Sequence, residues 1–211
     1  FNNAIADSKW IKKQSFSFGR WAIGYPCAYV LFRVLDEIKP RKILELGLGQ
    51  STRLLGQYAD NEQDVEHLVI ESDHRWIDLF KSNDMICRSS EIVPCGWKFC
   101  SYKNVKNIRV FEDFDKKIAG RRFDLIMIDA PIGGDMKEFS RIDVLLNLPD
   151  CIGESFVIIM DDADRQGERN TWNEMKSKLR NQGILFADGF YRGEKAAGVM
   201  VSDDLKYVLT M

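Results

Sequence analysis

A short apolar run that ends at two glycines constrains the fold of this chain more than any other feature. Lys42–Leu46 is apolar at three of its positions and carries Glu45 near its end, and Gly47 and Gly49 follow before Ser51-Thr52. This order predicts a buried strand that turns sharply into a helix. Glycines at the turn indicate that the backbone approaches a ligand closely there. The residues therefore predict a strand–turn–helix unit with a ligand site at the turn.

The spacing of the turn residues excludes two common phosphate-binding loops. The nicotinamide dinucleotide fingerprint G-x-G-x-x-G needs a third glycine where this chain has Thr52. The Walker sequence G-x-x-x-x-G-K-[ST] does not occur. Glu45 favours instead a ligand that carries positive charge near the loop. A plain strand–turn–helix connection without a ligand is the alternative reading.

The pattern Glu45-x-Gly47-x-Gly49-x-Ser51 resembles the first motif of class I S-adenosylmethionine-dependent methyltransferases. That family usually has glycine where this chain has Ser51, so the match departs at one position. The resemblance extends over Arg41 to Val201. It implies that Glu45, Gly47, Gly49 and Ser51 help to bind S-adenosylmethionine, whose sulfonium and amino groups are cationic.

Apolar runs alternate with helical patterns from Lys42 onward, which is typical of a parallel sheet covered on both faces. The expected strands are Ile43–Leu46, His67–Ile70, Asn107–Phe111, Phe123–Ile128, Phe156–Met160, Ile184–Phe190, Gly198–Val201 and Tyr207–Thr210. The expected helices are Cys27–Ile38 after Pro26, Ser51–Ala59, His74–Asn83, Asp113–Ala119, Glu138–Leu148 and Glu168–Asn181. The last strands are joined by short connections, which require antiparallel hairpins.

The fold class that follows is α/β, with a Rossmann-like, doubly wound and mostly parallel sheet. The resemblance implies seven strands and an antiparallel C-terminal hairpin. Residues 1–40 are expected to form an N-terminal helical or lid segment, and residues 41–211 the methyltransferase-like domain. The sequence leaves open whether Ile92-Val93 or Ile108–Val110 is the third strand, with Gly96–Asn104 as a hairpin-like insertion.

Glu71 ends the second expected strand, about 20 residues after the glycines, where a carboxylate can accept hydrogen bonds from ribose hydroxyls. The resemblance implies the same role. The alternative is that Glu71 or Asp73 caps the helix that begins near His74. We assign the cap to Asp73 and the ribose contact to Glu71.

Three further acids follow two neighbouring strands: Asp129 follows Phe123–Ile128, and Asp161 and Asp162 follow Phe156–Met160. Ligands of open α/β sheets bind at such strand ends. A few carboxylates with water and substrate oxygens suffice for Mg²⁺. The arrangement resembles metal-dependent O-methyltransferases of the catechol and sugar-modifying types. That resemblance implies that Asp129 faces the cofactor and the acceptor, that Asp129, Asp161 and Asp162 hold Mg²⁺, and that Asp129 and Asp162 are catalytic.

The predicted metal site depends on one condition of geometry. Neighbouring residues of a regular strand point to opposite faces, so Asp161 and Asp162 reach one ion only if the strand has already turned. The alternative is that Asp162 and Asp164 cap the next helix or form a turn. Without a metal, Asp129 is left as the general base.

A looser resemblance is to the 4-O-methyltransferases that act on glucuronic acid in polysaccharides. It rests on Ile128–Gly134 with its D-x-P-x-G loop, on Ser140-Arg141, on the D-x-D-R-like Asp162–Arg165, and on Ile92–Pro94. Arg141 and Arg165 then offer a carboxylated sugar a fork-shaped partner. As the alternative, either arginine pairs with neighbouring acids.

Composition limits the class of protein further. The net charge of −2 argues against a nucleic-acid partner, whose binding surface is a basic stripe. Five cysteines without CxxC spacing are typical of reduced thiols in a cytoplasmic protein. No apolar run approaches the length of a membrane span. The chain opens at Phe1 without a methionine, so the expected location is provisional.

We therefore predict an S-adenosylmethionine-dependent methyltransferase that modifies a hydroxyl group of a sugar or another small acceptor, with Mg²⁺ as a further cofactor. Two alternatives share the fold: an aminopropyltransferase and a non-catalytic S-adenosylmethionine-binding module. Aromatic residues before the first strand, Trp21 among them, belong either to the core or to a lid over the cofactor. The oligomeric state stays open.

Overall fold

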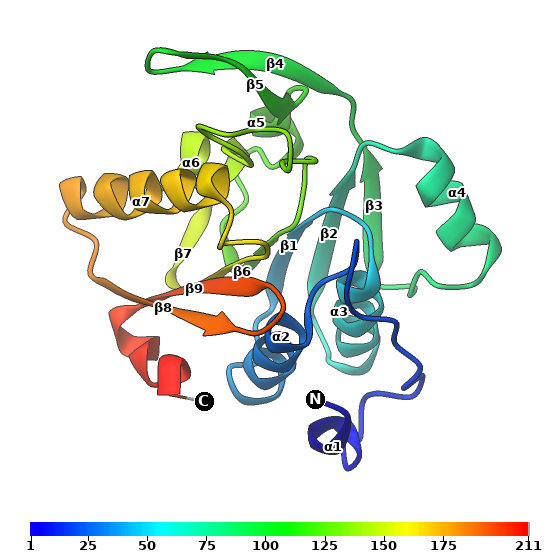
Figure 1. The fold of residues 1–211 in the computed structure, drawn as a ribbon. Helices are drawn as coiled ribbons and strands as arrows, with labels where there is room; N and C mark the ends of the chain where they lie inside the picture. The colour runs from blue at the N-terminus through cyan, green and yellow to red at the C-terminus, as the bar shows by residue number, and fades with distance from the viewer. Residues whose placement is uncertain (211) are drawn as a thin grey trace.

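A mixed sheet of seven strands forms the centre of the computed structural model, which describes residues 1–210 (Figure 1). The strand order is β3-β2-β1-β6-β7-β9-β8. The bounds of these strands are β1 Lys42–Leu46, β2 Glu66–Glu71, β3 Ser90–Pro94, β6 Phe123–Ile128, β7 Ile152–Met160, β8 Phe186–Arg192 and β9 Ala196–Ser202. The predicted doubly wound, Rossmann-like sheet is confirmed.

Within this sheet, the neighbouring strands β3, β2, β1, β6 and β7 run parallel, and β9 pairs antiparallel with both β7 and β8. Leu46 of β1 lies opposite Ile70 of β2 and Ile128 of β6. Ile128 in turn lies opposite Met160 of β7. The carboxyl ends of β1, β2, β6 and β7 therefore meet at one edge, where residues that follow these strands come together.

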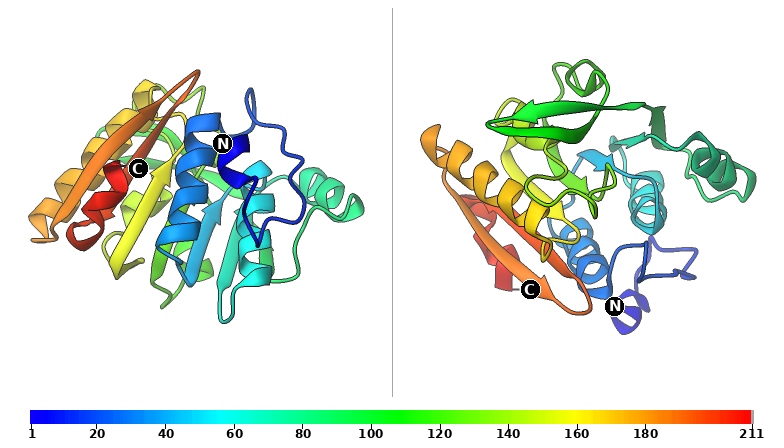
Figure 2. Two further views of the ribbon diagram at one scale, coloured as in Figure 1. Left: turned by 90° about the horizontal axis from the view of Figure 1, so that it is seen from below. Right: turned by 45° about the horizontal axis from the view of Figure 1, so that its top comes forward.

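The helices divide between the two faces of the sheet (Figure 2). Their bounds are α1 Asn2–Ile5, α2 Tyr25–Glu37, α3 Gln50–Asn61, α4 His74–Ser82, α5 Phe114–Lys117, α6 Asp143–Asn147 and α7 Gln166–Asn181. Helices α2 and α3 cover one face, and α5, α6 and α7 cover the other. None of the helices in residues 1–210 combines the length and the apolar character needed to cross a membrane.

Side chains alternate between the two faces of the sheet along each strand and contribute to two apolar cores. In β1, Leu44 and Leu46 point toward α7, whereas Ile43 points toward α2 and α3. In β6, Ile126 and Ile128 belong to the first core and Leu125 and Met127 to the second. Because successive side chains of a strand face opposite sides, a strand buried on both faces is apolar throughout.

The chain between β3 and β6 contains a separate hairpin of β4 Trp97–Tyr102 and β5 Val105–Phe111. Ile92-Val93 lies in β3 of the main sheet, and Ile108–Val110 lies in β5, which resolves the open choice for the third strand. Ile108 and Val110 are buried where β5 of the hairpin packs against the core of the main sheet, which accounts for their apolar character. The predicted hairpin-like insertion is confirmed.

Two predictions of secondary structure are wrong. Tyr207–Thr210 is not a strand but part of a 3₁₀ helix, η1 Asp203–Thr210. Leu205, Val208 and Leu209 pack toward the core, and this spacing suits a helix and not a strand. The predicted helix Glu138–Leu148 shortens to α6, because the left-handed backbone of Arg141, with φ of 55°, interrupts it.

Asp143, at the start of α6, is a buried acid that joins the hairpin to this helix. Its side chain is 1% exposed, and Oδ1 accepts a hydrogen bond of 2.8 Å from the N–H of Phe111. Burial raises the pKa of Asp143 to about 7, although the Phe111 N–H acts in the opposite direction. The folded chain therefore holds a proton here in a pH range where the unfolded chain has lost it.

We predict that this proton makes the fold less stable as the pH rises from about 4 to about 7, since only the folded state binds it there. The Asp143→Asn variant should lack this decline, which amounts to about 1.4 kcal/mol for each unit of pKa difference. Urea unfolding at pH 5 and pH 8 measures it, with the exposed Asp78→Asn as control. Equal pH dependence in all three proteins would contradict the assignment.

Candidate functional site

A crevice of about 380 Å³ opens at the carboxyl ends of β1, β2, β6 and β7. This volume lies in the range of small-molecule sites. Residues of the loops after these four strands line it, together with Arg20 and Trp21 of the N-terminal segment and Lys195 of the β8–β9 turn. The crevice thus occupies the place where open α/β sheets bind their ligands.

Gly47 is the point of closest approach between two of these loops. Its φ is 101°, and a Cβ atom there would lie 3.0 Å from the Cβ of Ala130. An L-residue rarely adopts this backbone, and its side chain would also crowd the loop after β6. Gly47 lines the crevice, as predicted for a ligand-binding turn.

Gly49 and Ser51 serve the start of α3. Gly49 is the N-cap residue, and its N–H donates a hydrogen bond of 2.8 Å to Oγ1 of Thr52. Ser51 is buried at 2% exposure in the first turn of the helix. Neither residue is among those that line the crevice, so a direct cofactor contact from them stays a prediction.

Glu45 is a correction to the predicted site, because the structure does not bring it to the crevice. It shares the α2–α3 side of β1 with Ile43 and is fully buried. Its Oε2 lies 3.0 Å from Nε2 of His67, whose Nδ1 lies 2.9 Å from Oγ of Ser90. Strand alternation therefore points Glu45 under α3, where it joins β1, β2 and β3 through side chains.

Glu71 lines the crevice at the end of β2 and organises the surrounding backbone. Its Oε2 accepts a hydrogen bond of 2.9 Å from the N–H of Leu48, and its Oε1 accepts from Ser72 and Asp73. A carboxylate offers about four acceptor positions, so Glu71 keeps capacity for a ligand hydroxyl. Asp73 caps α4 through the N–H groups of Arg75 and Trp76, which confirms its predicted role.

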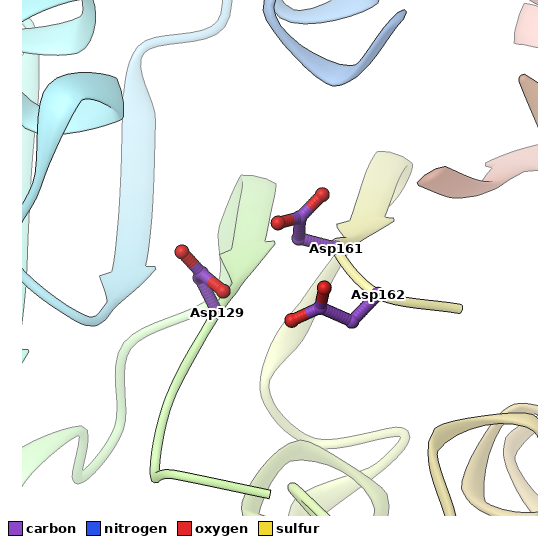
Figure 3. Close-up of side chains that lie close together, drawn as sticks. All are labelled: Asp129, Asp161 and Asp162. Atoms are coloured by element: carbon purple, nitrogen blue, oxygen red, sulfur yellow. The ribbon is translucent and has the colours of Figure 1, made fainter. Parts of the chain in front are cut away.

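Asp129, Asp161 and Asp162 meet at the neighbouring ends of β6 and β7 (Figure 3). One oxygen of each carboxylate lies within 4.8 Å of the others. Asp162 has a left-handed backbone with φ of 56°, so the chain has turned after β7 and both neighbours reach the cluster. Asp164 instead accepts the N–H of Ala196 at 3.1 Å, and α7 has no side-chain cap. Of the alternative, the helix cap is therefore wrong, but the turn is present, closed by the N–H of Arg165, which donates to the carbonyl oxygen of Asp162 at 2.9 Å.

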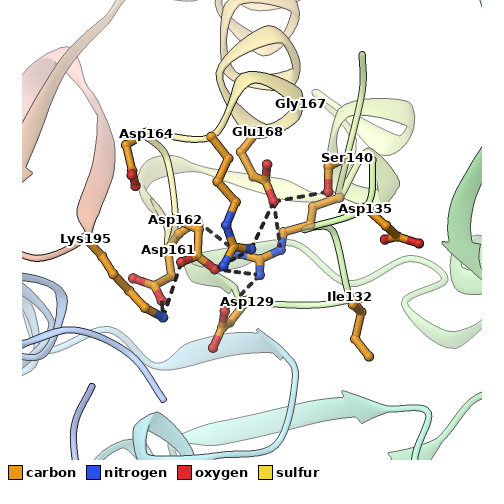
Figure 4. A network of polar contacts seen from close by, with 12 residues as sticks. Asp129, Ile132, Asp135, Ser140, Asp161, Asp162, Asp164, Gly167, Glu168 and Lys195 are labelled. Atoms are coloured by element: carbon orange, nitrogen blue, oxygen red, sulfur yellow. Dashed lines mark hydrogen bonds and ion pairs between the residues drawn. The ribbon is translucent and has the colours of Figure 1, made fainter. Parts of the chain in front are cut away.

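Basic side chains already pair with these three acids (Figure 4). Nη2 of Arg141 lies 3.1 Å from Asp129 and 3.0 Å from Asp162. Nζ of Lys195 lies 3.2 Å from both Asp161 and Asp162. Nη1 of Arg165 lies 2.9 Å from Asp162. Each carboxylate thus has at least one cationic partner.

Burial and charge act in opposite directions on these groups. Burial raises the pKa of Asp129, Arg141 counteracts it, and Asp161 and Asp162 add to the rise. Burial also raises the pKa of Asp161. For Lys195, burial would lower the pKa, but Asp161 and Asp162 outweigh it and the pKa rises. The lysine therefore stays charged beside the acids.

The donor set does not fit a resident divalent cation while these basic groups are in place. Three carboxylates suit Mg²⁺ in number and chemistry. However, the ammonium of Lys195 and the guanidinium of Arg141 lie at hydrogen-bonding distance from oxygens of the same three carboxylates. The predicted meeting of the three acids is confirmed, whereas the predicted Mg²⁺ requires these cations to move.

Several crevice residues lie outside the motifs. Trp21 is 94% exposed, an unusual state for a tryptophan, and it lines the crevice beside Arg20. Trp10 is buried against Phe32 and Tyr58 and belongs to the core. The sequence placed Trp21 in a cluster of aromatic residues before β1 but did not separate it from the core members of that cluster. No pattern in the sequence pointed to Lys195, because its role comes from how the β8–β9 turn packs.

Comparison with solved structures identifies the fold as that of class I methyltransferases. The O-methyltransferase TomG from Streptomyces achromogenes, in complex with SAM, has a TM-score of 0.60 at 13% identity, covering 86% of this chain and 82% of that chain. An O-methyltransferase from Bacillus cereus in complex with SAH has a TM-score of 0.60 at 15% identity, covering 88% and 84%.

A third neighbour, the precorrin-6y C5,15-methyltransferase from Geobacter metallireducens, has a TM-score of 0.54 at 10% identity and covers 92% of this chain and 96% of that chain. No protein-family model matches the sequence, and neither does any curated protein. The predicted fold is confirmed by the likeness to these solved structures.

We predict that Gly47→Ala destabilises the fold by about 1–3 kcal/mol and weakens binding of S-adenosylhomocysteine, because the new side chain is strained and crowds Ala130. Gly120→Ala is the matched control: its φ is 70°, but no atom lies within 4 Å of an added Cβ. Thermal melts with and without the ligand measure both effects. Normal ligand binding by a folded Gly47→Ala protein would contradict the loop assignment.

We predict that Glu71→Ala lowers both stability and cofactor affinity, since the buried N–H of Leu48 then loses its acceptor at a cost of about 1–3 kcal/mol. The contacts of Glu71 with three backbone N–H groups are the reason for the loss of stability. Calorimetric titration and melting of the same variant separate the two losses. A variant with wild-type stability would show that these backbone contacts are dispensable.

Proposed function

We propose that this protein is an S-adenosylmethionine-dependent methyltransferase that methylates a hydroxyl group of a small acceptor. One observation carries the proposal: a crevice at the strand ends of a class I methyltransferase fold brings Gly47, Glu71 and Asp129 together. Two neighbours of the same fold hold SAM or SAH. These neighbours are 13% and 15% identical to this chain and support its fold. The residues of this chain's own crevice support the activity.

The residues of the crevice suit S-adenosylmethionine. Gly47 leaves room over the end of β1, Glu71 has acceptor capacity for ribose hydroxyls, and Asp129, whose backbone lies beside Gly47, offers negative charge. When bound, this cofactor supplies a methyl group activated by a sulfonium. The contribution of the protein is then to position the acceptor oxygen behind that methyl group and to receive the proton that the hydroxyl loses.

Asp129 is the group best placed to receive the proton. Its side chain is 21% exposed and lines the crevice, whereas the side chains of Asp161 and Asp162 are 1% and 5% exposed. Burial raises its pKa, which brings the carboxylate closer in basicity to a useful general base. Asp162 then acts at a distance, by holding Arg141 beside Asp129.

A sugar carrying a carboxylate is the acceptor class that we propose. Arg165 is 39% exposed in its side chain and lines the crevice, so it has room for such a partner. Arg141 does not, because it is 4% exposed and bound to Asp129 and Asp162, and its predicted role as a substrate fork is withdrawn.

The β4–β5 hairpin supports an acceptor with apolar faces, such as a sugar ring. Trp97 and Phe99 are about half exposed, and Arg109 stacks over both rings. Arg109 also binds Asp135 and the carbonyl oxygen of Ile132, which both line the crevice. Exposed aromatic surface beside a site is typical of ligand recognition.

Other parts of the sequence prediction also belong to this proposal. All five cysteines are free thiols, which supports a reducing, cytoplasmic setting. The net charge of −2 favours a small acceptor over a nucleic acid. Because Arg141 and Lys195 already pair with the three acids, no step of the proposed reaction depends on Mg²⁺.

We predict that Asp129→Asn lowers methyl transfer by about 10²–10⁴-fold while the folded variant still binds S-adenosylhomocysteine, because the proton acceptor is lost together with the ion pair to Arg141. The assay follows formation of S-adenosylhomocysteine by mass spectrometry with a panel of hydroxylated acceptors that includes oligosaccharides of uronic acids. Asp78→Asn, on the exposed side of α4, is the control.

The two alternatives give different results in the same assay. A non-catalytic module binds the cofactor and forms no S-adenosylhomocysteine with any acceptor. An aminopropyltransferase uses the decarboxylated cofactor and a polyamine instead. Full activity of Asp129→Asn would contradict the role assigned to this carboxylate.

A further inference from the structure

We infer that Lys195 takes the place of a divalent cation in the cluster of Asp129, Asp161 and Asp162. The inference concerns the crevice of the proposed function, but it describes how the folded protein balances charge and does not require methyl transfer. The evidence is the position of Lys195, the charge of the cluster and the packing of the β8–β9 turn.

The Nζ atom of Lys195 bridges the two neighbouring acids after β7. It lies 3.2 Å from Oδ2 of Asp161 and 3.2 Å from Oδ1 of Asp162. Asp161 is fully buried, and its Oδ1 has no hydrogen-bond partner among the described residues. Two adjacent buried carboxylates repel one another unless a cation lies between them. The ammonium occupies that position.

The charges of the cluster are nearly balanced without any ion. Four acids, Asp129, Asp161, Asp162 and Glu168, are in contact with the three basic residues Arg141, Arg165 and Lys195. A divalent ion on the same oxygens would stand beside an ammonium and a guanidinium. That repulsion opposes metal binding as long as both basic groups remain.

Packing holds Lys195 in place, so its position is a property of the fold. Its side chain is 15% exposed, and Nζ also donates a hydrogen bond of 3.0 Å to the carbonyl oxygen of Ala22. A Cβ on Gly193, in the same turn, would lie 2.7 Å from the ring of Pro26. The β8–β9 turn therefore rests against the first turn of α2, and Lys195 links the segment beside Trp21 to the acids.

Removal of this ammonium should let the cluster bind a divalent ion, because Asp161 loses its only cationic partner among residues 1–210 while Arg141 continues to pair with Asp129 and Asp162. Asp161 and Asp162 would lose their shared partner, while their oxygens would stay within 4.8 Å of that of Asp129. Oxygen ligands at such spacing suit Mg²⁺ and Mn²⁺. The basic residue thus suppresses a site that the acids alone would form.

The test is a titration with Mn²⁺ alone, followed by electron paramagnetic resonance and calorimetry, without cofactor or acceptor. We expect Lys195→Ala to bind one Mn²⁺ at this cluster, at least about tenfold more tightly than any binding by wild type. Lys195→Arg keeps the charge and should behave as wild type. Lys206→Ala removes an exposed lysine paired with Asp203 and serves as the control.

A second variant confirms the place of binding. Asp162→Asn in the Lys195→Ala background should abolish the new site. If Lys195→Ala does not fold, Lys195→Gln replaces it, and a rise in its melting temperature with Mn²⁺ reports binding by mass action. The inference is overturned if wild type binds one Mn²⁺ that Asp162→Asn removes, or if folded Lys195→Ala or Lys195→Gln binds no more Mn²⁺ than wild type.

Discussion

Arg141 lies at 4% exposure between the carboxylates of Asp129 and Asp162, and much of the crevice depends on this arrangement. Breaking a buried ion pair on one side costs about 3–5 kcal/mol, because the other charge is left without compensation. The guanidinium also donates to the carbonyl oxygen of Asp161 at 2.9 Å. One side chain thereby joins the ends of β6 and β7 to the loop that connects them.

The surrounding backbone has the shape that this arginine requires. A Cβ on Gly133 would overlap Oγ of Ser140, and a Cβ on Gly167 would overlap the carbonyl oxygen of Met136. Ser140 in turn donates to Glu168 at the start of α7. The loop after β6, the first turn of α7 and the β8–β9 turn therefore meet around one set of charges.

Much of the fold could be predicted because its strands are buried on both faces. Ile43–Leu46 and Phe123–Ile128 are nearly continuous apolar runs, which few other structures require. Ile108–Val110 has the same character for a different reason, since it belongs to the separate hairpin and packs with it against the core of the main sheet. The prediction of a strand at Tyr207–Thr210 was wrong because an apolar pattern of so few residues fits a strand and a helix equally well.

The candidate site could be predicted where residues follow directly after a strand. Glu71, Asp129 and Asp161 reach the crevice or its cluster because parallel strands bring their carboxyl ends to one edge. Glu45 lies inside β1, where the alternation of side chains along the strand decides which way its carboxylate points. Its place in a loop motif therefore did not predict its position. Lys195 could not be predicted, since 34 residues separate it from Asp161 and only the packed turn places it there.

The most direct test is a crystal structure of the protein grown with S-adenosylhomocysteine and Mn²⁺, with anomalous diffraction measured for manganese. Our account predicts S-adenosylhomocysteine in the crevice over Gly47 and beside Glu71, with no anomalous peak among the three acids and Lys195 still between Asp161 and Asp162. A manganese peak on these carboxylates with Lys195 displaced, or the ligand bound elsewhere, would contradict it.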